Sequence, residues 1–139
     1  TRDARIVFLD DSIVRGTQLK DNVVKLRECG VKEVHIRIAC PPLIYPCCFL
    51  NFSTSRSTFD LFARRVIRDL EGTSELTDEI LKPYSDPDSE KYKEMVRVMC
   101  QHLQLDSLQF QRLDDLVKAI GLPKEQLCTH CWDNSSYME

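Results

Sequence analysis

The stretch Ile6-Val7-Phe8-Leu9-Asp10-Asp11-Ser12-Ile13-Val14-Arg15-Gly16-Thr17 decides the fold. Its first four residues form a β-branched and aromatic run of the kind that is buried on both faces of a parallel sheet, so we predict a central strand. The strand ends at Asp10-Asp11, because burying two adjacent charges would be costly. A helix is predicted over residues 18–29, where apolar residues recur at i, i+4 and i+7 and Gly30 follows as a C-terminal cap.

A second strand is predicted over residues 34–38, where apolar and polar side chains alternate until Pro41-Pro42 interrupts the pattern. Strand, loop, helix and strand together make a βαβ unit, which implies a right-handed crossover and a parallel sheet. We therefore predict an α/β protein in which an incomplete parallel sheet is followed by a mainly helical C-terminal region.

The rest of the chain is predicted to be mostly helical. Residues 41–57 are expected to form a loop-rich connection, and residues 73–90 an exposed connection or insertion, because turn-forming residues gather there. Helices are predicted over residues 59–70, where a full apolar stripe indicates a core-facing helix, and over residues 90–103 and 113–120. We divide the chain into residues 1–56, which carry the sheet and its loop, and residues 57–139, the helical region.

Composition limits the possible classes of protein. The chain has 139 residues, 42% of them hydrophobic and 29% charged, as expected of one globular domain. A net charge of -3 argues against non-specific binding to nucleic acids, and no apolar run approaches the length of a membrane span. The chain opens at Thr1 without a targeting segment, and a strand pattern begins at once. We therefore expect a section of a longer cytoplasmic protein.

The residues between the first strand and the first helix suggest a binding site for a phosphorylated sugar. Backbone N–H groups at a helix N-terminus and the helix dipole attract an anion. Ser12 and Thr17 offer hydroxyl groups to the same phosphate, and Gly16 lets the backbone approach it. Asp10 and Asp11 cannot bind phosphate directly, and their natural partners are ribose hydroxyls and Mg²⁺. The alternative is a polar strand end and helix entry without a ligand.

The same stretch resembles the phosphoribosyl pyrophosphate (PRPP) loop of the type I phosphoribosyltransferases, and its amino-acid sequence is similar to that of the glutamine PRPP amidotransferase family. Residues 26–39, 40–47, 106–108 and 113–121 also resemble this family, so the likeness covers most of the chain, with residues 73–95 the poorest match. The resemblance implies the C-terminal part of a type I phosphoribosyltransferase domain. The PRPP-binding residues that it implies are Asp10, Asp11, Ser12, Ile13, Val14, Arg15, Gly16 and Thr17, with Asp10 and Asp11 also holding Mg²⁺.

Seven cysteines raise the question of a metal centre. Cys128 and Cys131 have the C-x2-C spacing that aims two sulfurs at one metal, but zinc or an iron–sulfur cluster takes four ligands. The family resemblance implies that Cys47 is a third ligand of a [4Fe–4S] cluster whose fourth ligand lies upstream. Three alternatives stay open: ordinary cysteines, zinc with His130 as a further ligand, and Cys48 in place of Cys47. Cys29, Cys40 and Cys100 are expected to be packing residues.

For function, the resemblance implies an amidophosphoribosyltransferase, a glycosyltransferase that moves ammonia from glutamine to PRPP. The products are 5-phosphoribosylamine, glutamate and pyrophosphate, in the first step of de novo purine biosynthesis. The glutaminase part is absent, so no catalytic residue is expected in this section and the chain alone is expected to be inactive. The implied partners are PRPP and glutamine, with no nucleic acid or membrane, in a homo-oligomeric parent enzyme. Two alternatives are a non-catalytic PRPP sensor and a zinc-stabilised interaction module.

Overall fold

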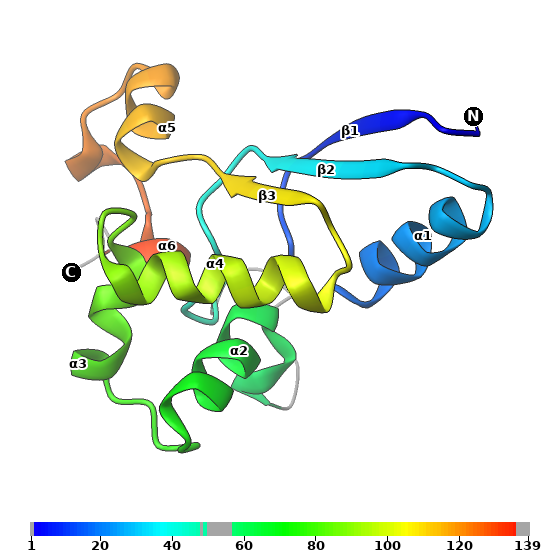
Figure 1. Ribbon diagram of the computed structural model, residues 1–139. Coiled ribbons are helices and arrows are strands. Elements are labelled where there is room, and N and C mark those ends of the chain that lie inside the picture. The colour runs from blue at the N-terminus through cyan, green and yellow to red at the C-terminus, as the bar shows by residue number, and fades with distance from the viewer. Residues whose placement is uncertain (1, 48, 50–56, 136–139) are drawn as a thin grey trace.

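A computed structural model of the chain describes residues 2–47, 49 and 57–135. Three strands form one sheet, and most helices lie on one side of it (Figure 1). In chain order, with η for 3-10 helices, the elements are β1 (Arg5–Asp10), α1 (Thr17–Glu28), β2 (Glu33–Ile38), η2 (Thr58–Asp60), α2 (Phe62–Glu71), α3 (Asp78–Leu81), η3 (Lys82–Ser85), α4 (Glu90–His102), β3 (Ser107–Phe110), α5 (Leu113–Ile120), η4 (Lys124–Gln126) and α6 (His130–Asp133). The predicted α/β class and βαβ unit are confirmed. None of the described helices is long and apolar enough to cross a membrane.

The sheet has the order β1-β2-β3, and both pairings are parallel. The prediction that the first strand is central is therefore wrong for the part of the chain that the structure describes, where β2 is central and β1 is an edge strand. Val7 and Leu9 are 61% and 83% exposed. A strand that is apolar on both faces is expected inside a sheet that helices cover on both sides. In the part of the chain that the structure describes, β1 pairs with a strand along one edge only.

The third strand was not predicted, because its residues were included in the helical region 57–139. Ser107–Phe110 is only four residues long, too short to show a period of two. Asp106 fixes its position, because one of its carboxylate oxygens accepts hydrogen bonds from Val34 N at 2.7 Å and from Arg27 Nη2 at 2.6 Å. This carboxylate ties the start of β3 to both β2 and α1.

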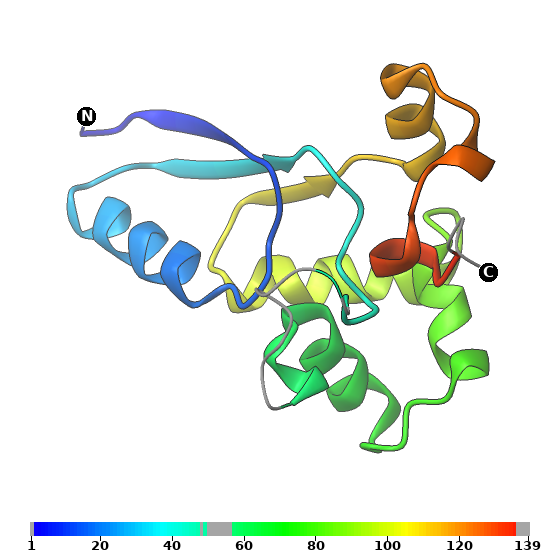
Figure 2. The same cartoon turned by 180° about the vertical axis from the view of Figure 1, so that it is seen from behind.

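The main core lies between the sheet and helices α2 and α4, which pack against each other (Figure 2). The predicted apolar stripe of residues 59–70 is confirmed as core, although it is divided between η2 and α2 by the extended residue Leu61. Its buried members are Phe62, Ala63, Val66 and Ile67, which share the main core with Ile36, Ile38, Met95, Met99 and Leu108, whereas Leu70 is exposed.

The prediction that residues 73–90 form an exposed connection holds only in part, because many of them are exposed but two are buried. Leu81 and Tyr84 are 0% and 2% exposed and belong to the main core. The hydroxyl of Tyr84 donates a hydrogen bond to Glu71 Oε1 at 2.6 Å. The polar residues that suggested a loop instead cap short helices, since the side chains of Thr77 and Ser89 accept hydrogen bonds from the first turns of α3 and α4.

Replacing Asp106 by Asn is expected to weaken the fold and to change its response to acid. Hydrogen bonds from Val34 N and then from Arg27 lower the pKa of Asp106. A lowered pKa in the folded state stabilises the fold above the unfolded pKa of about 4, and this contribution is lost as the pH falls through the folded value. The side chain is 36% exposed, so solvent screening limits the loss at pH 7 to about 1 kcal/mol.

Urea unfolding at pH 7 and pH 3 gives the free energy of unfolding of Asp106→Asn and of the unchanged protein. The difference in free energy between the two proteins should be smaller at pH 3. Asp69→Asn is the control, because Asp69 is exposed and pairs with Arg68 on its own helix. Equal losses in both variants, or a difference that grows in acid, would contradict the role assigned to Asp106.

Candidate functional site

The loop that joins β1 to α1 lines an open depression of about 850 Å³. Of the predicted PRPP-binding residues, all but Asp11 line it, namely Asp10, Ser12, Ile13, Val14, Arg15, Gly16 and Thr17. Gln18, Leu19 and Asn22 of α1 also line the depression and were not predicted. Gln18 and Asn22 are four residues apart and so share one face of the helix, which is the signal that could have indicated them.

Gly16 makes the sharp entry into α1 possible. It is the N-cap residue and has φ 76°, a left-handed conformation that suits glycine. A Cβ atom at this position would lie 3.2 Å from Cδ1 of Phe62. Thr17 is the first residue of this 12-residue helix, whose first turn contains no acidic residue. The N–H groups and positive dipole end of α1 therefore face a site suited to an anion.

The carboxylates of the two aspartates at the end of β1 have different surroundings. Both are exposed; the carboxylate of Asp10 accepts a hydrogen bond from Asp11 N at 2.9 Å, and that of Asp11 accepts one from Ser12 Oγ at 3.1 Å. Asp11 also lies near Cys40, whose pKa is raised to about 11, mainly by burial and partly by the Asp11 charge. Of the two, only Asp10 lines the depression.

The segment after β2 contacts the C-terminal cysteines. The carbonyl oxygen of Cys131 accepts hydrogen bonds from Ile44 N at 2.9 Å and from Tyr45 N at 3.0 Å. The pKa of Cys131 is raised to about 12, mainly by burial. The charge of Cys47, a hydrogen bond with Cys47 and the charge of Cys128 raise it further. The structure thus brings the three predicted cluster cysteines near one another.

These cysteines do not form a complete metal site. Within residues 2–47, 49 and 57–135, no three or more His, Cys, Asp or Glu side chains are grouped so that they could hold a metal ion. Cys48, the alternative to Cys47, lies outside the described residues. The ring of His130, the alternative zinc ligand, packs against Tyr45 with centroids 6.0 Å apart.

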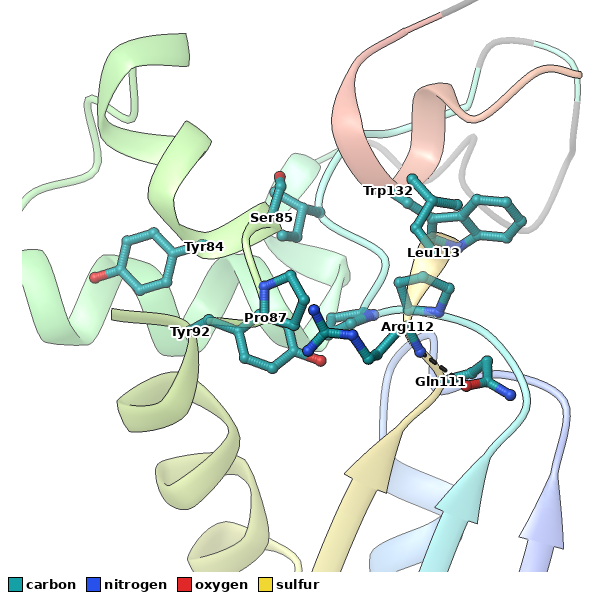
Figure 3. Close-up of a pocket in the computed structure, with 11 residues that line it drawn as sticks. Tyr84, Ser85, Pro87, Tyr92, Gln111, Arg112, Leu113 and Trp132 are labelled. Carbon is teal, nitrogen blue, oxygen red and sulfur yellow. Dashed lines mark hydrogen bonds between the residues drawn. The ribbon is translucent and has the colours of Figure 1, made fainter. Parts of the chain in front are cut away.

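A small cavity lies beside the cysteine turn. Tyr92, Arg112 and Trp132 are among the residues that line it (Figure 3), and its volume is only about 10 Å³. Arg112 is held there by two hydrogen bonds to the carboxylate of Asp88, at 2.9 and 3.0 Å. A cavity of this size holds at most one water molecule. It lies where Trp132 of the C-terminal turn meets Ser85 of η3 and Tyr92 of α4.

Comparison with known proteins identifies the relatives of the chain. No family model matches it. It is 31% identical to the amidophosphoribosyltransferase of Mycobacterium bovis over 139 residues, which cover 99% of this chain and 21% of the relative. The chain is homologous to one section of the amidophosphoribosyltransferases. Another amidophosphoribosyltransferase, from Pyrococcus horikoshii, is 63% identical over 43 residues, which are 31% of this chain and 10% of the relative.

Solved structures of amidotransferases share the fold. The glutamine PRPP amidotransferase from B. subtilis, complexed with ADP and GMP, has a TM-score of 0.61 and 27% identity, and the match covers 94% of this chain and 23% of that one. A structure described as the allosteric regulatory enzyme of purine biosynthesis has a TM-score of 0.64 and 26% identity, with 97% and 23% coverage. The predicted likeness to the type I phosphoribosyltransferase sheet is confirmed. The chain spans about a fifth of the length of the curated amidophosphoribosyltransferases.

Replacing Gly16 by Ala is expected to destabilise the protein more than replacing Gly72 by Ala. Both glycines have positive φ, 76° and 68°, but an added Cβ meets the Phe62 ring only at Gly16 and has no atom within 4 Å at Gly72. We expect each substitution to lower the free energy of unfolding by about 1 kcal/mol for the backbone conformation, with about 1 kcal/mol more at Gly16 for crowding.

Urea unfolding at one pH measures both variants. Equal losses would show that the contact with Phe62 is not what selects glycine at the entry to α1.

Proposed function

We propose that this chain is the PRPP-binding section of an amidophosphoribosyltransferase. The observation that carries the proposal is the β1–α1 loop, where the N-terminus of α1 and the carboxylate of Asp10 line one open depression. The chain is also homologous to amidophosphoribosyltransferases. The complete reaction would transfer ammonia from glutamine to PRPP, giving 5-phosphoribosylamine, glutamate and pyrophosphate at the start of purine synthesis. Glutamine hydrolysis would belong to another part of the longer protein. A cytoplasmic location and a homo-oligomeric parent enzyme belong to the same proposal.

The loop would hold the sugar by its 5′-phosphate. Main-chain N–H groups between residues 12 and 17 would donate to the phosphate oxygens, and the hydroxyls of Ser12 and Thr17 would add two further donors. Fixing the phosphate fixes the position of the sugar ring, so that C1 is held ready for attack by ammonia. The positive end of α1 would offset part of the substrate's negative charge.

The two aspartates would act on the ring and the leaving group. Asp10 and Asp11 would accept hydrogen bonds from the ribose hydroxyls, and their exposed oxygens suit the water shell of Mg²⁺. When bound, Mg²⁺ would neutralise charge on the departing pyrophosphate. Bond breaking at C1 creates positive charge on the sugar, which nearby carboxylates stabilise. Neither aspartate need remove a proton, because ammonia is itself a nucleophile.

Replacing both aspartates by Asn tests this assignment. In the longer enzyme that contains this section, Asp10→Asn with Asp11→Asn should abolish PRPP-dependent release of pyrophosphate and leave glutamine hydrolysis intact. Pyrophosphate and glutamate are measured in parallel assays. Asp69→Asn is the control on α2, away from the loop. Unchanged synthesis of the aminated sugar by the double variant would remove the role proposed for the aspartates.

We also propose that Cys47, Cys128 and Cys131 contribute to a [4Fe–4S] cluster. The support is that backbone hydrogen bonds to Cys131 place the segment before Cys47 against the C-x2-C turn, and that thiolates favour iron–sulfur clusters. The described residues do not form a metal site by themselves, so the proposal requires a further ligand from outside the chain.

Metal analysis distinguishes the cluster from zinc. The longer enzyme that contains this section, purified without oxygen, should contain iron and acid-labile sulfide in equal amounts, and its Cys131→Ser variant should lose both. Cys29→Ser is the control, because Cys29 is exposed at the end of α1. Zinc without sulfide would favour the interaction module, and protein free of iron, sulfide and zinc would contradict both metal proposals.

A further inference from the structure

Helix α2 holds two successive carbonyl groups of the β1–α1 loop. The N–H of Phe62, in the first turn of α2, donates a hydrogen bond to the carbonyl oxygen of Val14 at 2.7 Å. One turn along the helix, Nη2 of Arg65 donates to the carbonyl oxygen of Arg15 at 2.5 Å. Both carbonyl groups therefore point toward α2.

This arrangement fixes the direction of two N–H groups. The C=O and N–H of a trans peptide point in opposite directions, and no cis peptide bond occurs among the described residues. The carbonyl of Val14 shares a peptide unit with the N–H of Arg15, and the carbonyl of Arg15 shares one with the N–H of Gly16. Both N–H groups are thus turned away from α2, on a loop that lines the open depression. In the part of the chain that the structure describes, neither donates to a backbone carbonyl of the loops and turns.

Arg65 is itself held in place. Its Nη1 donates to the carbonyl oxygens of Phe59 at 3.0 Å and Asp60 at 3.1 Å, at the end of η2. Its guanidinium carbon lies 5.5 Å from the centroid of the Phe62 ring. The planar fork of arginine can serve several acceptors at once, which the ammonium group of lysine cannot do in the same fixed geometry. Arg65 therefore connects η2 rigidly to the loop.

We propose that Arg65 is a positioning residue of the phosphate loop. By holding the carbonyl of Arg15, it directs the N–H of Gly16 into the depression, where that N–H donates to the phosphate of the sugar. Arg65 acts through this peptide unit and does not touch the phosphate itself. The identity of the ligand rests on the proposed function, but the direction of the Gly16 N–H does not.

The test combines two NMR measurements on the ¹⁵N-labelled chain. Residual dipolar couplings report the direction of the Gly16 N–H without ligand, and titration with D-ribose 5-phosphate gives a Kd from the amide shifts of residues 12–17. In Arg65→Ala the Gly16 coupling should change, and Kd should rise about tenfold, the effect of one lost hydrogen bond to a charged group. Arg65→Lys keeps the charge but not the fork, so it should resemble Arg65→Ala more than the unchanged protein.

Arg68→Ala is the matched control. Arg68 lies on the same helix, with its guanidinium carbon 5.2 Å from the centroid of the Phe59 ring, and it pairs with Asp69 rather than with the loop. Its removal should leave both the Gly16 coupling and Kd unchanged. If Arg65→Ala does not fold, as judged by its thermal transition, the comparison rests on Arg65→Lys.

Two results would overturn the role of Arg65. One is a Gly16 coupling that stays the same in the folded variants, and the other is wild-type affinity in Arg65→Lys, which would show that only the charge matters. Absence of ribose 5-phosphate binding by the unchanged protein would instead count against the proposed function. The ligand-free couplings would still decide whether Arg65 directs the loop.

Discussion

The two-sided pairing of β2 is the constraint on which the rest of the structure depends. Val34 and Ile36 are fully buried, and the strand lies between β1 and β3 in a parallel sheet. Parallel pairing brings the carboxyl ends of β1 and β2 to the same edge, where Ala39 N donates a hydrogen bond to the carbonyl of Asp10 at 2.9 Å. The loop after β1 and the cysteine-bearing segment after β2 consequently start side by side.

Helix α2 links both of these segments to the core. Its apolar face buries Val66 and Ile67, while two consecutive arginines on the helix each bind a backbone carbonyl of a different segment. Arg65 holds Arg15 of the phosphate loop, and Arg64, which is 8% exposed, donates from Nε to the carbonyl of Ile44 at 2.6 Å. Burial lowers the pKa of Arg64. One helix thus serves as core and as the support for both candidate binding regions.

Sequence alone predicted those parts of the fold that have a repeating pattern. The apolar stripe of α2 and the alternation in β2 follow from the geometry of helices and strands, and both are confirmed. β3 could not be predicted in this way, because four residues show no period and their position depends on the distant Asp106 carboxylate. Residues 73–90 were misjudged in part, because the same polar residues that favour turns also cap helices, and the packing of Leu81 and Tyr84 could not be seen in the pattern.

The candidate site was predictable to a similar extent. The β1–α1 loop has hydroxyl residues and a glycine-containing turn that opens a helix, and this combination favours anion binding. The support from α2 has no sequence signature, since a side chain that donates to a backbone carbonyl 50 residues away leaves no pattern of spacing. Arg65 looks like any charged residue on the polar face of an amphipathic helix.

The edge position of β1 also bears on how the chain behaves in concentrated solution. Within the described residues its outer peptide groups face no other strand, and Val7 and Leu9 extend the exposed apolar surface beside them. Such an edge favours aggregation by strand addition between molecules. Dilute samples are therefore the appropriate ones for measuring affinity.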